Sequence, residues 1–336
     1  MLRVGFTKGK IEDGSRPNWT GNGSRPIAWS AWYPTDDDAE KDFRSNSQAG
    51  SSFIAGEVID NARLGGRRDL YPVVPLSHGT GGTAAGLGWL GQRLARQGFV
   101  AVGVDHHGNT ATEPYRPEGF LCWWERSRDL TVLMDRIVLE GPFAERLDLD
   151  HIFAAGFSLG GYTVLSLLGA ITDTSLFLDW AGDQPWGSGP REFPDLATKI
   201  GPLLETSAVF RASWARQSLS YKDARIKAAL LCAPAPTVRG LTPESLREIR
   251  VPVVITVGGA DLEAPSEPCS EWLTEYLPRC AFEPLGPTVG HYVFLCECSD
   301  SGRKHEAEIC IDAPGVDRRS IHDRTAALAL GAFSTS

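Results

Sequence analysis

The chain has 336 residues, 42% of them hydrophobic, and a formal net charge of −9 at pH 7. That composition is typical of a globular protein with a core. The acidic balance, without a cluster of Lys and Arg, argues against a nucleic acid partner. No run of about 18 apolar residues predicts a membrane span. The first residues show no signal-peptide pattern, which favours a cytoplasmic location.

The first 70 residues have the pattern of an antiparallel lead-in to a larger sheet. Residues 25–33 alternate between apolar and small or polar side chains, as a half-buried strand does, and residues 4–6 are its expected partner. Residues 36–50 are polar and poor in large apolar groups, which predicts a surface loop.

From Tyr71 onward, apolar runs alternate with amphipathic helical patterns. Such alternation predicts an α/β fold with a mostly parallel central sheet and helices on both faces. The expected strands are 71–77, 99–105, 151–155, 226–232, 251–257 and 282–285. The expected helices are 87–95, 123–139, 162–168, 270–276 and 324–333.

The pattern breaks between residues 171 and 225. This stretch contains three tryptophans, a Gly/Pro-rich part and a helical segment near 203–214. At about 55 residues it is far longer than an ordinary connection, whose median length is about 4–6 residues. We interpret it as a cap inserted into a core domain made of residues 1–170 and 226–336. The alternative is an elaborated surface excursion.

Ser158 lies between the strand at 151–155 and the helical pattern that follows it, with Gly156 and Gly160 two residues away on either side. A serine in this position has the pattern of a nucleophile elbow, in which a strained turn lifts the hydroxyl above the sheet. Side chains at the two glycines would collide with the adjoining strand and helix. The pattern also arises by chance, so Ser158 needs partners.

His291, after the last expected strand, is the candidate base among seven histidines, and Gly290 leaves room for an open turn. Asp261, after the strand at 251–257, is the first choice for the acid that orients the imidazole. Glu263 is the fallback and Asp105 a third choice. His322 falls beside the final helical pattern, which indicates a structural residue.

Two backbone N–H groups are candidates for an oxyanion hole. Leu159 follows the nucleophile, and Thr80 lies in the Gly-rich loop after the strand at 71–77. His78 would shape this loop without acting as the base. The alternative is a flexible Gly-rich loop that has no part in catalysis.

The elbow, the loop 77–82, the segment 104–110 and the ending 290–292 together resemble an α/β-hydrolase. The closest resemblance is to the branch that contains platelet-activating-factor acetylhydrolase and dienelactone-hydrolase-like esterases. Dienelactone hydrolases proper carry Cys where Ser158 stands, so lactone chemistry is not implied. The acetylhydrolases place their acid after an earlier strand, where this chain has Cys232, and the use of Asp261 is more like cutinase-type polyester hydrolases.

The resemblance and the order Ser, Asp, His imply a serine hydrolase that cleaves small-molecule carboxylic esters through an acyl-enzyme, without a metal or organic cofactor. Amide or carbamate cleavage by the same triad is one alternative, and a catalytically silent binding protein is another. A homodimer is compatible with the sequence. Aromatic residues are expected to line the substrate pocket: Phe120, Trp123, Trp124, Trp180, Trp186 and Trp214.

Seven cysteines leave the redox compartment open. Cys122 and Cys232 lie in apolar contexts and are expected to be core thiols. A disulfide between Cys298 and Cys310 is more plausible than a zinc site with Cys296 and His305, because the spacing fits no common closed zinc site. Such a disulfide would imply an oxidising compartment and would argue against the cytoplasm.

Overall fold

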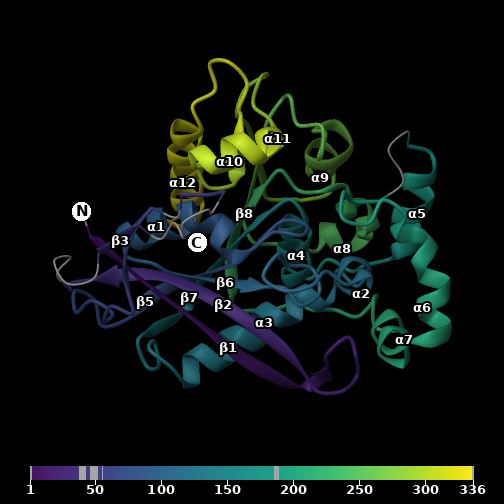
Figure 1. The fold of residues 1–336 in the computed structure, drawn as a ribbon, viewed down its shortest axis with the longest axis horizontal. Helices are drawn as coiled ribbons and strands as arrows, with labels where there is room; N and C mark the ends of the chain where they lie inside the picture. The colour runs from purple at the N-terminus through teal and green to yellow at the C-terminus, as the bar shows by residue number, and fades with distance from the viewer. Residues whose placement is uncertain (1, 38–42, 46–51, 55, 185–188, 335–336) are drawn as a thin grey trace.

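The structure is a computed structural model that describes residues 2–37, 43–45, 52–54, 56–184 and 189–334. Within these described residues, ten strands form one sheet at the centre of the molecule (Figure 1). They are β1 (Arg3–Pro17), β2 (Ser24–Thr35), β3 (Phe43–Ser45), β4 (Glu57–Asp60), β5 (Tyr71–Ser77), β6 (Val100–Asp105), β7 (Leu147–Phe157), β8 (Ile226–Cys232), β9 (Val253–Val257) and β10 (Cys280–Pro284). Their order across the sheet is β10-β9-β8-β7-β5-β6-β2-β1-β4-β3.

The six strands from β10 to β6 all run parallel to one another. The N-terminal strands then extend the sheet, with β2 antiparallel to β6 and β1 antiparallel to β2. The antiparallel lead-in predicted from the sequence is therefore confirmed. The expected loop at 36–50 is wrong at residues 43–45, which pair with β4 as β3; residues 38–42 and 46–50 lie outside the described part of the chain.

Helices cover both faces of this sheet. The longer ones are α1 (Gly88–Arg96), α3 (Glu125–Leu139), α4 (Leu159–Leu167), α5 (Thr174–Gly182) and α12 (Arg318–Ser334). The shorter ones are η1 (Ala84–Leu87), α2 (Pro117–Leu121), η2 (Leu196–Lys199), α6 (Ile200–Thr206), α7 (Ala208–Trp214), η3 (Pro236–Gly240), α8 (Pro243–Arg247), η4 (Glu267–Glu271), α9 (Trp272–Thr274), η5 (His291–Phe294), α10 (Asp300–His305) and α11 (Ala307–Cys310).

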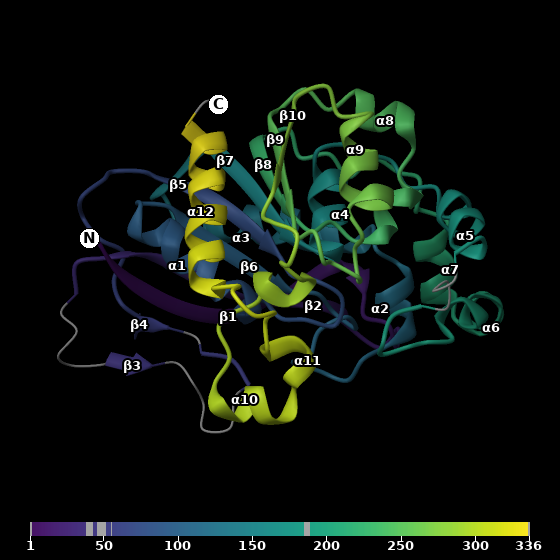
Figure 2. The same ribbon diagram turned by 90° about the horizontal axis from the view of Figure 1, so that it is seen from above.

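Two apolar clusters hold the helices to the sheet, one on each face. Strand β7 contributes to both, because successive side chains of a strand point to opposite faces. Ile152 and Ala154 belong to the cluster that contains α3 and α4, while Phe153 and Ala155 belong to the cluster that contains α1 and α12. Figure 2 shows α12 lying over the sheet beside α1. Burial on both faces explains why the parallel strands are continuous apolar runs.

Helices α5, α6 and α7 lie together at one side of the sheet, on the right in Figure 1. They belong to the segment 171–225, of which residues 185–188 lie outside the described part of the chain. A third apolar cluster joins this segment to α2 and its surroundings through Phe120, Trp124, Leu196 and Phe210.

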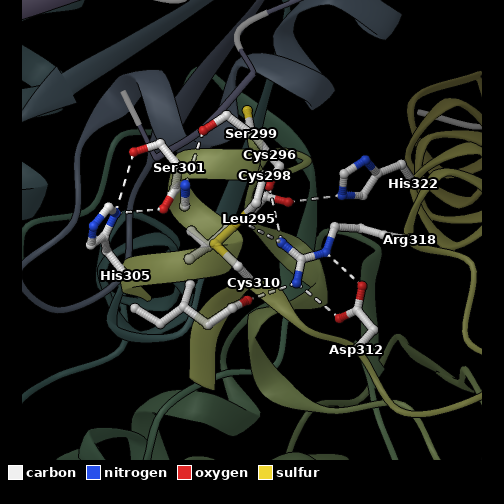
Figure 3. Close-up of a disulfide and its surroundings, with 12 residues drawn as sticks. Leu295, Cys296, Cys298, Ser299, Ser301, His305, Cys310, Asp312, Arg318 and His322 are labelled. Carbon is white, nitrogen blue, oxygen red and sulfur yellow. Dashed lines mark hydrogen bonds and ion pairs between the residues drawn. A yellow bond between two sulfur atoms is a disulfide. The ribbon is translucent and has the colours of Figure 1, made fainter. Parts of the chain in front are cut away.

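The C-terminal part of the chain is crosslinked by a disulfide between Cys298 and Cys310. The prediction of this bond is confirmed, and Cys122 and Cys232 are buried thiols, as expected. Figure 3 shows Arg318 beside the disulfide, where it donates hydrogen bonds to the carbonyl oxygens of Cys296 and Ile309. A disulfide is typical of an oxidising compartment, whereas the cytoplasm keeps thiols reduced. The cytoplasmic location stays a prediction.

Among the described residues, no helix combines the length and the apolar character that crossing a bilayer requires.

Candidate active site

Ser158 stands at the junction of β7 and α4 in a backbone conformation that side chains rarely adopt, with φ 54° and ψ −119°. A Cβ at Gly156 would collide with the carbonyl oxygen of Gly160, and one at Gly160 would collide with that of Ser77. Both glycines are therefore required for close packing around the turn. The strained turn expected for a nucleophile elbow is present.

His291 lies between Ser158 and Asp261. Its Nδ1 is 2.7 Å from Asp261 Oδ2, and its Nε2 is 3.1 Å from Ser158 Oγ. An ionised carboxylate can only accept, so Nδ1 carries the hydrogen and Nε2 is left to accept from the serine hydroxyl. All three side chains are at most 8% exposed. The geometry is that of a nucleophile, a base and an orienting acid.

The loops that carry the acid and the histidine are tied together by their backbones. Ala260 N–H donates to Val289 O over 3.0 Å, and a Cβ at Gly258 would collide with that same carbonyl. Asp261 Oδ1 accepts from Ala264 N–H at 2.7 Å, which directs Oδ2 toward the imidazole. The position of the acid is therefore set by contacts on both of its oxygens.

The structure separates the three candidate acids. Asp105 accepts a hydrogen bond from Ala84 N–H at 2.7 Å, and burial raises the pKa of its carboxyl group. Glu263 lines the cavity described below and has no recorded hydrogen bond to His291 among the described residues. Asp261 is the carboxylate that contacts the imidazole.

His322 is a buried residue of α12. Its Nε2 donates to the carbonyl oxygen of Val293 at 2.8 Å, and its ring stacks on Trp89 with the centroids 4.0 Å apart. Its Nδ1 finds no hydrogen-bond partner among the described residues. Burial lowers the pKa of this imidazole to about 3, so it stays neutral in the folded protein.

This histidine should make the protein less stable in mild acid. In the unfolded chain it takes up a proton below pH 6.5, while in the folded chain it does so only near pH 3, so the free energy of unfolding falls as the pH drops through that window. His322→Gln keeps a donor for Val293 O and removes the titration. Between pH 6 and 5, we expect the free energy of unfolding of the variant to fall by about 1.4 kcal/mol less per pH unit than that of the wild type. Urea unfolding at pH 7, 6 and 5 measures both slopes, and parallel slopes would contradict the expectation.

The loop after β5 holds the Thr80 peptide in one orientation. Gly79 O accepts from His78 Nδ1 at 2.6 Å and from Gly82 N–H at 3.2 Å. In a trans peptide the carbonyl oxygen and the next N–H point in opposite directions, so Thr80 N–H points away from these two donors. Thr80 and Leu159 both line the cavity, and no acceptor for either N–H is found among the described residues.

His78 shapes this loop, as expected. Its Nδ1 donates to Gly79 O, and its Nε2 accepts from His106 N–H at 3.1 Å. A ring that donates through Nδ1 and accepts at Nε2 is the neutral imidazole. Burial and the neighbouring Arg126 hold the pKa of His78 well below its usual range, which agrees with that state.

A cavity of about 980 Å³ opens above Ser158. Four of the predicted aromatic residues line it, namely Phe120, Trp123, Trp180 and Trp214. The prediction for Trp124 is wrong: its ring is fully buried, packs against Trp214 and donates through Nε1 to Ser213 O at 3.1 Å. Trp186 lies outside the described residues.

Several residues of the cavity wall were not predicted from the sequence. Apolar ones come from α5 and η2, and polar ones lie near the catalytic residues: Phe177, Leu178, Leu196, Tyr115, Glu192 and Tyr292. Burial raises the pKa of the Glu192 carboxyl group. The run of large apolar residues at 176–178 was a usable signal for Phe177 and Leu178, whereas nothing local in the sequence singles out Tyr115 or Glu192.

No model of a protein family matches the chain. Among curated proteins, it is similar to Cutinase 2 of Thermobifida cellulosilytica, with 29% identity over 147 residues, which are 42% of this chain and 51% of that protein. A cutinase of Thermobifida alba is 28% identical over 167 residues, 48% of this chain and 51% of that protein. The match thus spans about half the length of these curated relatives.

Among solved structures, a ferulic acid esterase from Streptomyces cinnamoneus superposes with a TM-score of 0.65. It is 18% identical, and the superposition covers 99% of this chain and 90% of that one. With the sheet order and the elbow, this likeness shows that the chain has the α/β-hydrolase fold. Placement in the acetylhydrolase and dienelactone-hydrolase-like branch stays a prediction.

Proposed function

We propose that this chain is a serine hydrolase that cleaves carboxylic esters. The observation that carries the proposal is the unbroken hydrogen-bonded line from Ser158 Oγ through His291 to Asp261, at the base of a large cavity. The similar proteins support the same function, since cutinases and ferulic acid esterases are ester hydrolases.

The reaction follows from the protonation states that the geometry requires. His291 Nε2 takes the hydroxyl proton of Ser158 as Oγ attacks the ester carbonyl. The N–H groups of Thr80 and Leu159 stabilise the oxyanion, and Asp261 stabilises the imidazolium. The imidazolium then protonates the departing alcohol, which leaves an acyl-enzyme on Ser158. A water molecule, deprotonated by His291, attacks the acyl group and releases the acid.

The segment 171–225 acts as a cap in this proposal. It supplies much of the apolar wall of the cavity, through residues such as Phe177, Trp180 and Ile200. Apolar walls with few polar groups are typical of small-molecule sites. We therefore expect a small ester with a sizeable apolar part as substrate.

A panel of p-nitrophenyl esters and the matching p-nitroanilides tests the proposal. Esters should be hydrolysed and anilides should react far more slowly, because an amide has a poorer leaving group. Equal or faster anilide cleavage would favour an amidase instead. Absence of turnover on both series, with a correctly folded protein, would contradict a hydrolase.

Replacement of a cap tryptophan should alter substrate binding. Arg239 lies between Trp180 and Trp272, at 5.5 Å and 4.4 Å from the two ring centroids, but only Trp180 lines the cavity. Trp180→Ala should raise KM for a naphthyl ester about 10-fold and change kcat little, because burial of an aromatic surface on binding is lost. The matched control Trp272→Ala should leave KM within about twofold. Steady-state kinetics measure both KM values, and similar values in the two variants would contradict the assignment of Trp180 to the cavity wall.

A further inference from the structure

A buried arginine contacts both segments that carry the candidate oxyanion donors. Arg126, on α3, is 1% exposed. Its Nη2 donates to His78 O, and its Nη1 donates to Asn109 Oδ1 at 3.2 Å. Burial lowers the pKa of the guanidinium to about 9, so it is charged at neutral pH. A charged donor makes stronger hydrogen bonds than a neutral one.

Asn109 extends the reach of Arg126 to the far side of the loop. Its Oδ1 also accepts from Gly81 N–H at 2.8 Å. The peptide group that carries Thr80 N–H joins residues 79 and 80. The carbonyl of the preceding peptide group, His78 O, accepts from Arg126. The N–H of the following peptide group, that of Gly81, donates to Asn109. The Thr80 peptide has little freedom to rotate.

The same guanidinium also contacts the elbow helix. Arg126 Nε donates to Thr163 Oγ1 at 3.0 Å, and the Thr163 hydroxyl donates to Leu159 O at 3.1 Å. One side chain thus binds the loop that carries Thr80 and, through the Thr163 hydroxyl, is linked to the carbonyl of Leu159 at the start of α4. Two oxyanion donors are useful only if their separation and direction are fixed before the reaction.

We propose that Arg126 and Asn109 are positioning residues that hold the N–H groups of Thr80 and Leu159 in register for the oxyanion. This inference rests on the proposed function. Neither side chain contacts the substrate; both act through the backbone of the loop and of α4.

Two pairs of variants test the inference. Arg126→Met removes the donors and Arg126→Lys keeps the charge; Asn109→Ala removes the acceptor and Asn109→Asp keeps it. Arg128→Met is the matched control, because Arg128 lies on the same helix with its side chain 46% exposed. The enzyme is titrated with a fluorophosphonate so that kcat refers to active sites only.

We expect Arg126→Met to lower kcat about 100-fold, the effect of losing one oxyanion donor, with KM within about twofold of the wild type. The inhibition constant of phenylboronic acid, which forms a tetrahedral adduct with an oxyanion-like oxygen, should rise by a similar factor. Asn109→Ala should lower kcat about 10-fold, and the Lys and Asp variants should each recover part of the loss. Arg128→Met should behave as wild type.

Wild-type kcat in both Arg126→Met and Asn109→Ala would overturn the inference, as would losses confined to KM. If Arg126→Met fails to fold, the two Asn109 variants decide, and an equal loss in both would contradict the role of the acceptor. These outcomes are distinct from failure of the proposed function, in which the wild type itself would neither hydrolyse esters nor react with the fluorophosphonate.

Discussion

Replacing Ser158 with alanine is expected to lower kcat for p-nitrophenyl esters by on the order of 10⁶-fold, the loss found when the nucleophile of a serine hydrolase is removed. No other hydroxyl among the described residues is recorded in contact with His291 Nε2, so no group can replace the nucleophile. Residual turnover would come from the oxyanion donors and the cavity alone. Steady-state kinetics over a range of enzyme concentrations measure the ratio.

Ser166→Ala is the matched control for this variant. Ser166 lies on α4, the helix that follows Ser158; it is fully buried, and its hydroxyl has no hydrogen-bond partner among the described residues. Its replacement should leave kcat unchanged and should not lower the stability. A Ser158→Ala variant that retained more than about one hundredth of the wild-type kcat would contradict the assigned nucleophile.

The second large effect is expected for Asp261→Asn. Ala264 N–H requires an acceptor, so the amide oxygen of Asn will face it, and the amide NH₂ will face His291 Nδ1. The amide then donates to Nδ1, and the hydrogen of the imidazole moves to Nε2, where it cannot accept the proton of Ser158. Loss of the correct tautomer typically lowers kcat roughly 10⁴-fold.

Glu263→Gln is the control, because Glu263 lies two residues from Asp261 and lines the cavity above Ser158, with no hydrogen bond to His291 found in the described part of the chain. Its kcat should stay within about fivefold of wild type. The values of kcat for both variants at several pH values show which carboxylate orients His291. A larger loss in Glu263→Gln than in Asp261→Asn would reverse the assignment.

Most of the sheet could be predicted from the sequence, because strands buried on both faces are continuous apolar runs. Strands β5, β6, β8 and β9 are short apolar runs whose observed bounds lie within two residues of the expected ones, whereas β7 begins four residues before the expected 151. The ends of helices were harder to predict from the sequence. Helix α12 begins at Arg318, six residues before the expected start, because polar residues of its first turns, such as Arg318 and His322, are buried by tertiary contacts. A hydrophobic pattern carries no sign of such burial.

The elbow, the histidine and the acid could be placed from the sequence because each lies within six residues of the end of a predicted strand. Residues that act from a distance could not. Arg126 and Asp129 have the spacing of an exposed helix face, yet both are at most 1% exposed. They are buried because Arg16 and Arg25, from β1 and β2, form ion pairs with Asp129 at 2.7 Å. Only the assembled sheet brings these distant charges together.

The failure at Trp124 has a related cause. Trp123 lines the cavity, whereas the neighbouring Trp124 is turned away from it and packs against Trp214. Composition identified the aromatic cluster, but the direction of each ring depends on the packing of α7, whose Trp214 and Ser213 enclose Trp124. A rule based on aromatic content alone does not resolve that choice.

The central claim is that the Ser158 hydroxyl is activated by His291. The most direct test is to react the folded protein with a fluorophosphonate and locate the adduct by peptide mass spectrometry. We expect one phosphonyl group, on Ser158, with labelling greatly slowed in His291→Ala. An adduct on another residue, or no adduct on a correctly folded wild type, would contradict the account.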